Sequence, residues 1–515
     1  MKPWKWHMVL LMAVGLASAP VFAAEMRVVG FIDNVFPHFG SNMSAFDRDT
    51  TRNGDQEFFG RQRNRLFFNF IASDDLRGVF GIEVDLAYGA PSGDRLGSGC
   101  VEGTGPFRFE QCGFRNSIDV NALEVKHLYV DFRVPQLPVG NRWRIGGFRF
   151  QALPLHTSLV YNIDGGGGDL QLTFTDQVSL LLSYQQAEED LDRFAGSAKI
   201  GEDYITGATL MLKPIPDLDF HILGLYGHLQ APFGANLTGT GGPFVAIAQD
   251  ARNVATEDRY YLGFDARWRI GNTRIEPTFV YLLGERKFTA ASAALTGVES
   301  TDYDGFLAHL NILHTRGPWL FGAKFAYKSG NEADDDLNNR GIGNRADVGF
   351  RQWATEADRF GEWFEILGRS EVDGVTLRSP YRYGEIGLLD RFGWMSVGGH
   401  VEYKATDNLI LTGSVGGFWA AERPGCSANF RVGSLSGPCT GPGMPLNSSD
   451  EPSLNFTGDG KFVGWEINAG FRYTIMPGLV WTPIIAYADY GDALSTNNRK
   501  AMDAWSFSNR MIYLF

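Results

Sequence analysis

The chain ends with residues 504–515, AWSFSNRMIYLF, in which nearly every second residue is aromatic or large and apolar. The members of this face are Trp505, Phe507, Met511, Tyr513 and Phe515, and only Asn509 interrupts them. Side chains two positions apart in a β-strand point to the same face of the sheet. The stretch therefore predicts a strand that has one apolar, aromatic-rich face.

Upstream segments alternate in the same way, and their polar faces carry charges. In residues 258–270, one face has Tyr260, Leu262, Phe264, Ala266, Trp268 and Ile270, and the other has Arg259, Asp265, Arg267 and Arg269. Several ionised groups on one face cannot be buried in a dry core, whereas a wet lumen accepts them and lipid accepts the apolar face. We therefore predict an all-β fold, a transmembrane antiparallel β-barrel; the alternative is a secreted β-sandwich or solenoid.

About 18 segments fit this pattern, with 16 as the alternative, and either number is even, as in single-chain bacterial barrels. They are 26–36, 60–72, 77–88, 121–134, 141–150, 168–175, 178–188, 203–213, 218–229, 258–270, 273–286, 302–314, 317–328, 392–405, 408–419, 461–475, 478–490 and 503–515. Short connections, expected in the periplasm, alternate with long glycine-rich ones, expected outside the cell. The long ones are 89–120, 230–257, 329–391 and 420–460.

Within the longest connection, residues 351–367 break the two-residue period. Trp353, Phe360, Trp363 and Leu367 recur there at helical spacing. This spacing predicts a short amphipathic helix.

Composition narrows the class of protein further. The 515 residues include 63 glycines, 13% aromatic and 20% charged residues, and 44% are hydrophobic, which excludes intrinsic disorder. The net charge of −13 argues against a nucleic-acid partner. Lys2 and Lys5, an apolar run and the small residues before the bond after Ala23 predict a secretory signal peptide over 1–23. Residues 24–515 then form a single barrel domain.

Four cysteines form two local pairs in loop sequences. Because an exported chain enters an oxidising compartment, we expect disulfides Cys100–Cys112 and Cys426–Cys439. Asp334, Asp335 and Asp336 are the one candidate for a Ca²⁺ site, but they lack the spacing of an EF-hand loop, so a solvated acidic loop is the alternative. No haem-attachment or nucleophile motif occurs, so we expect no cofactor, no other metal and no enzymatic activity.

The C-terminal strand looks like the sorting signal that the bacterial barrel-assembly machinery reads, with Tyr513 and Phe515 as its aromatic residues. Together with the signal peptide and the alternating loop lengths, it predicts a location in the bacterial outer membrane. The surrounding partners would then be outer-membrane lipids and lipopolysaccharide.

Three stretches resemble trimeric porins, most closely the homotrimeric porins of sulfate-reducing bacteria. They are 60–66 (GRQRNRL) with 72–78 (ASDDLRG), 125–132 (VKHLYVDF) before Val134-Pro135, and 503–515. The resemblance implies a homotrimer in which each chain forms its own pore, with contacts through the outer faces of 26–36 and 503–515. In general porins a constriction loop follows the fifth strand. Here that position holds only the short segment 151–167, so this segment or another loop narrows the pore.

The inward faces supply the candidate pore-lining residues. They are Arg63, Arg65, Glu83, Asp85, Asp131, Arg142, Arg144, Arg267 and Arg269. Guanidinium groups opposite carboxylates create a transverse field that orients polar solutes and sets ion preference. The alternative is that these charges only brace the wall. The arginine rows favour anions and the acidic total favours cations, so the sign of the preference stays open.

These features predict a porin, a water-filled channel for passive diffusion of ions and small hydrophilic solutes. Two other functions remain open: a specific channel for small carboxylates, and a structural barrel that sheathes a partner such as a cytochrome. A TonB-coupled transporter is disfavoured because strands begin almost at the signal cleavage site, which leaves no room for a plug domain.

Overall fold

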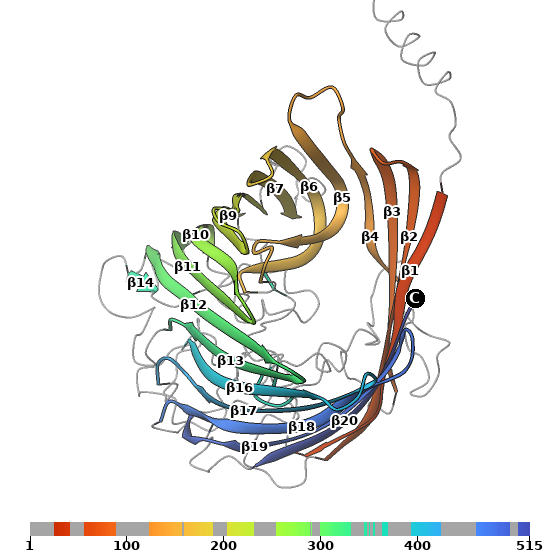
Figure 1. Ribbon diagram of the computed structural model, residues 1–515. Coiled ribbons are helices and arrows are strands. Elements are labelled where there is room, and N and C mark those ends of the chain that lie inside the picture. Colours follow the sequence, from red (N-terminus) through yellow and green to blue (C-terminus); the bar gives the residue numbers. More distant parts are fainter. Residues whose placement is uncertain are drawn as a thin grey trace, which may run out of the picture.

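A closed antiparallel β-barrel makes up the computed structural model of this chain (Figure 1). Each wall strand pairs with the strand before it and the strand after it in sequence, and β1 also pairs with β20, which closes the sheet. The wall contains 18 strands, as the sequence predicts. Closure removes the free sheet edges, so every wall strand has a neighbour on both sides.

The structure describes residues 25–41, 56–88, 123–156, 159–188, 203–230, 254–288, 290, 299–330, 345–347, 350, 354–355, 363–368, 393–423, 460–494 and 503–515. The first nine strands are β1 (Glu25–Ser41), β2 (Gln56–Ser73), β3 (Leu76–Tyr88), β4 (Leu123–Phe132), β5 (Gly140–Gln151), β6 (Tyr161–Thr175), β7 (Val178–Glu188), β8 (Asp203–Leu212) and β9 (Leu218–Gln230). The remaining wall strands are β10 (Val254–Ile270), β11 (Thr273–Phe288), β12 (Ser300–Arg316), β13 (Trp319–Lys328), β16 (Trp394–Lys404), β17 (Leu409–Trp419), β18 (Phe462–Met476), β19 (Leu479–Tyr490) and β20 (Ala504–Leu514).

Several sequence-based boundaries need correction. β6 begins at Tyr161, so the glycine run of 165–168 lies within a strand, and β10 begins at Val254, inside the expected connection 230–257. The connection 329–391 contains two short strands, β14 (Arg345–Asp347) and β15 (Ala354–Thr355), which pair in parallel with β12 and β6. The helix expected over 351–367 is wrong for the described part of that segment, because 354–355 form β15 and 363–367 are not helical. There, hydrogen bonds to the barrel wall replace those of a helix.

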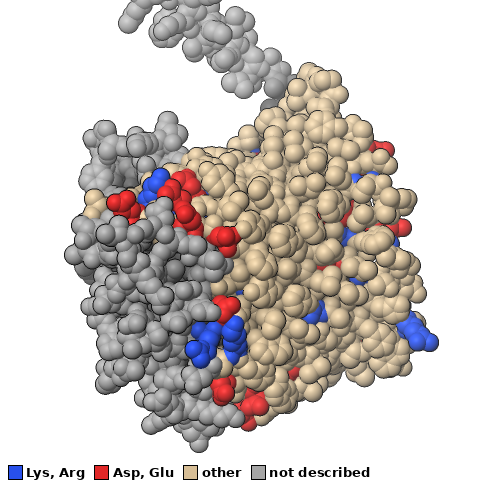
Figure 2. Space-filling view, turned by 90° about the vertical axis from the view of Figure 1, so that its left-hand side faces the viewer, with Lys and Arg blue, Asp and Glu red and all other residues tan. Residues whose placement is uncertain are grey.

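The outer face of the barrel is apolar. On β10, Tyr260 and Leu262 are 46% and 52% exposed, whereas the intervening Tyr261 is completely buried. Figure 2 shows a broad belt with few charged residues between the charged edge beside the loops and the opposite end of the barrel. A closed barrel with such a belt satisfies its backbone groups internally while facing hydrocarbon, so this is a transmembrane barrel. In the part of the chain that the structure describes, no helix is long and apolar enough to cross a membrane.

The lumen is partly filled by two connections that fold inward from the end of the barrel with the long loops. Loop 152–160 joins β5 to β6 and contacts β10 and β11. Segment 363–368 belongs to the connection between β13 and β16 and contacts β17 and β18. Around both, buried apolar residues form one cluster that includes Phe148, Leu153 and Phe364. The barrel interior therefore has a packed region beside its polar wall.

β5 bends away from β4 at a pair of glycines. Backbone pairing between β4 and β5 covers only 128–132 with 143–147, whereas β5 pairs with β6 along its whole length. Gly146 has φ 132°, and a Cβ there would lie 2.3 Å from the carbonyl oxygen of Leu128. Beyond this point β5 and β6 curve together away from β4 (Figure 1). Only glycine adopts this backbone geometry readily, so the sequence positions the bend.

We expect Gly146→Ala to lower the free energy of unfolding by about 1–3 kcal/mol, because it forces an L-residue into a glycine-only conformation. Gly166→Ala on β6 is the matched control, since a Cβ at Gly166 would meet nothing within 4 Å. The measurement is the temperature at which the folded band disappears on unboiled electrophoresis gels. Equal transition temperatures for the two variants would show that Gly146 does not define the bend.

Candidate functional site: the charged lumen wall

The first group of inward charges surrounds Glu83 on β3. Arg63 and Arg65 of β2 both form ion pairs with its Oε2 atom, the former at 3.7 Å. Lys126 of β4 contacts the other oxygen, with Nζ 3.1 Å from Oε1. Three cations thus share one carboxylate, because consecutive strands bring same-face residues side by side.

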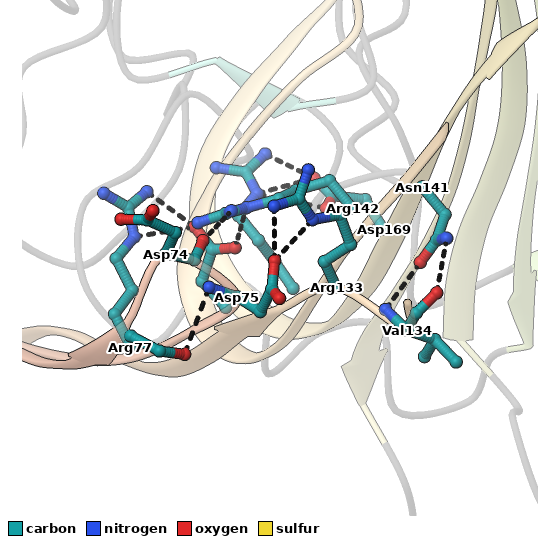
Figure 3. A network of polar contacts seen from close by, with 11 residues as sticks. Asp74, Asp75, Arg77, Arg133, Val134, Asn141, Arg142 and Asp169 are labelled. Carbon is teal, nitrogen blue, oxygen red and sulfur yellow. Dashed lines mark hydrogen bonds and ion pairs between the residues drawn. The ribbon is translucent and has the colours of Figure 1, made fainter. Parts of the chain in front are cut away.

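A second group lies nearer the short turns, on β3 to β6 (Figure 3). Asp131 of β4 accepts hydrogen bonds from Arg77, 2.8 Å from Nε and 2.5 Å from Nη2, and forms an ion pair with Arg142. Arg144 donates from Nε to both oxygens of Asp169, each at 3.0 Å. Its guanidinium carbon also lies 4.5 Å from the ring centre of Phe148. The Asp169 carboxylate and the Phe148 ring together hold Arg144 in one orientation.

The opposite wall repeats the arrangement on β10 to β12. Glu276 of β11 contacts Arg267 at 2.8 Å and Arg274 at 2.9 Å through Oε1, and Asn311 donates to its Oε2 at 2.8 Å. Arg269 is exposed two residues beyond Arg267, beside the short turn that follows β10. Glu276 pairs with two arginines, so in this group too the cations outnumber the carboxylate with which they pair.

In the groups around Glu83, Asp131 and Glu276, the carboxylates are buried more deeply than the cations. The side chains of Glu83, Asp131 and Glu276 are 3%, 2% and 4% exposed. Arg142 and Arg144 are each 36% exposed, and Arg274 is 39% exposed. The surface of these groups that meets lumen water is therefore richer in guanidinium groups than the residue count suggests.

Loop 152–160 is attached to the wall through a buried carboxylate. Asp265 of β10 accepts hydrogen bonds from the backbone N–H groups of Leu155 and His156 at 3.0 and 3.1 Å, and from the Thr278 hydroxyl at 2.9 Å. The His156 ring contacts the same carboxylate and lies 3.7 Å from Glu276. The short segment after the fifth strand thus folds inward, where sequence reasoning left two possibilities open.

The attachment of loop 152–160 is expected to weaken at high pH. Burial by itself lowers the pKa of His156, but hydrogen bonds and charges from Asp265 and Glu276 raise it to about 9. The contribution is complete below the ordinary pKa near 6.5 and is lost as pH rises through about 9, a difference of about 3 kcal/mol. We expect channel conductance to rise between pH 8 and pH 10, measured in planar bilayers. His156→Gln removes the titrating group, so an unchanged pH profile in this variant would contradict the assignment.

Segment 363–368 is attached through Glu466 of β18, which has no exposed surface. Its carboxylate accepts hydrogen bonds from three consecutive backbone N–H groups, those of Glu365 at 2.7 Å, Ile366 at 2.9 Å and Leu367. Ser414 of β17 donates to the carbonyl oxygen of Trp363 at 2.7 Å. These bonds replace the helical ones that the sequence pattern led us to expect.

Glycines on the wall make room for the two rings of this segment. A Cβ at Gly416 would lie 2.5 Å from the Phe364 ring, and one at Gly322 would lie 2.7 Å from Trp363. Trp363 also stacks on His400, with ring centres 5.0 Å apart, and Lys324 Nζ lies 4.4 Å from its ring centre. The two rings occupy the space that the glycines leave free, so segment 363–368 packs against the wall in one position.

The structure brings most of the predicted pore residues together. Arg63, Arg65 and Glu83 form one group, and Arg142, Arg144 and Asp131 lie in the next. Asp85 lies on β3 opposite Arg63 in the register, and its side chain lies outside the described residues. Sequence reasoning did not select Lys126, His156, Asp169, Glu276 or Glu466. Asp169 shares a strand face with Gln171 and Thr173 and could have been found from this alternation. His156 and Glu466 depend on contacts between distant segments.

Other predicted features fall outside the described residues. These are the signal peptide 1–23, Cys100, Cys112, Cys426 and Cys439, the acidic residues Asp334, Asp335 and Asp336, and the loops 89–120 and most of 420–460. Within the described ranges, no group of three or more His, Cys, Asp or Glu residues is arranged to hold a metal ion.

Comparisons by sequence identify no relative: no protein-family profile and no curated protein matches this chain. Among solved structures, OccK11 (OpdR) of Pseudomonas aeruginosa is similar with a TM-score of 0.46 and 13% identity, over 95% of this chain and 96% of that one. The outer membrane protein OpdK of the same species has a TM-score of 0.48 and 10% identity, over 95% of this chain and 98% of that one. OccAB4 of Acinetobacter baumannii has a TM-score of 0.46 and 11% identity, over 96% of this chain and 100% of that one.

 A second OpdK structure, determined with vanillate, is 11% identical to this chain at the same coverage. None of these proteins shares enough sequence with this chain to transfer a role to any residue.

Proposed function

We propose that this chain is a bacterial outer-membrane channel through which ions and small hydrophilic solutes diffuse passively, with a preference for anions. The observation that carries the proposal is the unequal burial inside the barrel. Wall carboxylates are buried, whereas the arginines that pair with them remain in contact with the lumen. A closed barrel of this strand number encloses a water-filled lumen, and charges on a narrow lumen set the ion preference.

The long loops then lie outside the cell and the short turns in the periplasm, as in other outer-membrane barrels. Tyr513 and Phe515 would serve the barrel-assembly machinery, and Phe515 also closes the wall by exchanging backbone hydrogen bonds with Gly30 at 3.0 and 3.1 Å. The two segments inside the lumen leave less room for a sheathed protein partner, which favours a channel for small solutes.

Planar-bilayer recording of the purified protein in a KCl gradient tests this proposal. We expect stepwise openings and a reversal potential of the sign given by chloride preference. A specific carboxylate channel would differ, because its current would saturate as the carboxylate concentration rises. Absence of conductance from folded, heat-modifiable protein, or a clear potassium preference, would contradict the proposal.

We further propose that the channel is a homotrimer, as the likeness to the homotrimeric porins of sulfate-reducing bacteria implies. Support comes from the outer faces of β1 and β20, where Ile32, Phe36, Met511 and Tyr513 are all exposed and apolar. Light scattering in detergent should give the mass of three chains, and currents should close in thirds. A monomeric mass with full conductance would contradict the trimer but not the channel function.

A further inference from the structure

The wall between β4 and β5 lacks a continuous backbone ladder at the end with the long loops. Among the described residues, the last pair between these strands is Leu128 with Gly147. Residues 123–127 of β4 pair only with β3, and residues 148–151 of β5 pair only with β6. Five residues of a strand span about 16 Å, so this seam extends over a large part of the membrane thickness.

Side chains close the seam where the backbone does not. Lys126 Nζ lies 2.6 Å from Oδ2 of Asp164 on β6, and the His127 ring lies 3.7 Å from the other oxygen. Both groups come from a β-bulge in β4 that interrupts the register between Gly81 and Ile82 of β3. An ion pair between side chains is easier to open than a ladder of backbone hydrogen bonds, since the strands need not unpair.

A cavity of about 370 Å³ lies directly behind the seam. Much of its lining is apolar: Tyr129, Phe148, Phe150, Leu181, Ile205 and Leu225. Three charged residues also line it: Arg144 and Asp169, which are paired with each other, and Arg149. A cavity of this volume with a largely apolar lining fits one small uncharged organic molecule of up to three rings.

The outward side of the seam is apolar as well. Leu123, Val125 and Leu128 of β4 are 63%, 61% and 60% exposed, the highest values among the described large apolar residues. Leu123 and Val125 lie beyond the last β4–β5 pair, so β5 does not cover their flank, and Leu128 lies opposite Gly147, which has no side chain. The same bend therefore creates the cavity, the seam and its apolar rim.

We propose that this seam is a lateral passage, through which small uncharged aromatic molecules move between the cavity and the hydrocarbon of the membrane. The Lys126–Asp164 ion pair closes the passage, and the glycines at 146 and 147 allow the bent half of β5 to stand away from β4. This passage differs from the polar pore in direction, because it leads into the membrane, although Arg144 and Asp169 line both. It rests on the transmembrane barrel and not on the anion preference.

Uptake of N-phenyl-1-naphthylamine by Gram-negative host cells that carry the chain tests the passage. This uncharged dye, which consists of a naphthyl and a phenyl group, fluoresces when it enters hydrocarbon. Intact lipopolysaccharide slows its entry. Asp164→Lys places a second ammonium group beside Lys126, so we expect the seam to open and the uptake rate to rise several-fold above that of the wild-type chain. Asp75→Asn, which breaks an ion pair with Arg133 in a short turn, is the matched control and should leave uptake unchanged.

A second variant acts in the opposite direction. Ser183 lines the cavity from β7, so Ser183→Phe should fill it and lower uptake, also when combined with Asp164→Lys. Uptake that stays high in the double variant would show general leakage of the membrane and would overturn the passage. Equal rates for folded wild-type chain, Asp164→Lys and cells without the chain would overturn it too. Conductance in KCl, measured in parallel, reports the polar pore independently.

Discussion

Replacing Glu466 by alanine is expected to release segment 363–368 from the wall and raise the single-channel conductance. The substitution removes the acceptor of three buried backbone N–H groups, and hydrogen bonds to a charged group contribute about 1.5–3 kcal/mol each. Because about 1.4 kcal/mol changes an equilibrium tenfold, the attached population should fall by several powers of ten. The measurement is the conductance step in planar bilayers, together with the size limit for neutral sugars in a liposome-swelling assay.

Independent variants show whether the effect arises from the segment. Gly416→Ala places a Cβ 2.5 Å from the Phe364 ring and should have the same effect without touching Glu466. Gly399→Ala, where a Cβ would meet only a carbonyl oxygen at 3.9 Å, and Glu422→Gln, near the outer ends of the strands, should both conduct like the wild-type chain. Unchanged conductance and size limit in Glu466→Ala and Gly416→Ala would mean that segment 363–368 does not narrow the pore.

Removing two lumen arginines should invert the ion preference. In Arg142→Gln/Arg144→Gln, the buried Asp131 and Asp169 lose cations that now cover them, so the local surface changes from basic to acidic. Each charge near the path is worth roughly 0.5–1 kcal/mol in a wet lumen, or about 2- to 5-fold in local ion concentration. The reversal potential in a KCl gradient should therefore move from chloride toward potassium preference.

The control for this change is a pair of exposed arginines at the end of the barrel with the short turns. Arg27 and Arg133 are exposed at 64% and 49% and pair with Glu25 and Asp75 near the short turns. Arg27→Gln/Arg133→Gln removes the same charge and should leave the reversal potential close to the wild-type value. If the lumen variant also kept that value while conducting normally, its arginines would brace the wall without facing the ions.

Much of the barrel could be predicted from the sequence because each strand carries its own signal. Alternation placed Tyr260 and Leu262 outside and Arg259 and Arg267 inside before any contact was known. Turn residues gave the short connections, so the strand number followed. β6 was predicted too short because its glycine run, 165–168, has no side chains to alternate.

The helix expected over 351–367 failed for a different reason. Apolar residues at helical spacing also suit an irregular segment whose rings enter separate pockets, as Trp363 and Phe364 do against Gly322 and Gly416. Loop 152–160 was equally ambiguous, because its attachment depends on Asp265, more than 100 residues away in sequence.

The sequence by itself determined the class of fold, the strand count and the face on which most wall charges lie, because alternation is a local property of the chain. Only the tertiary structure decided which charges share a partner, which of them stay exposed, and which segments fill the lumen. Those properties depend on register and on contacts between distant strands: Glu83 meets Lys126, and Glu466 meets the backbone of segment 363–368, only after the barrel has closed. Pairing across the sheet, and not the order of residues along it, decides how the lumen is charged and how it is narrowed.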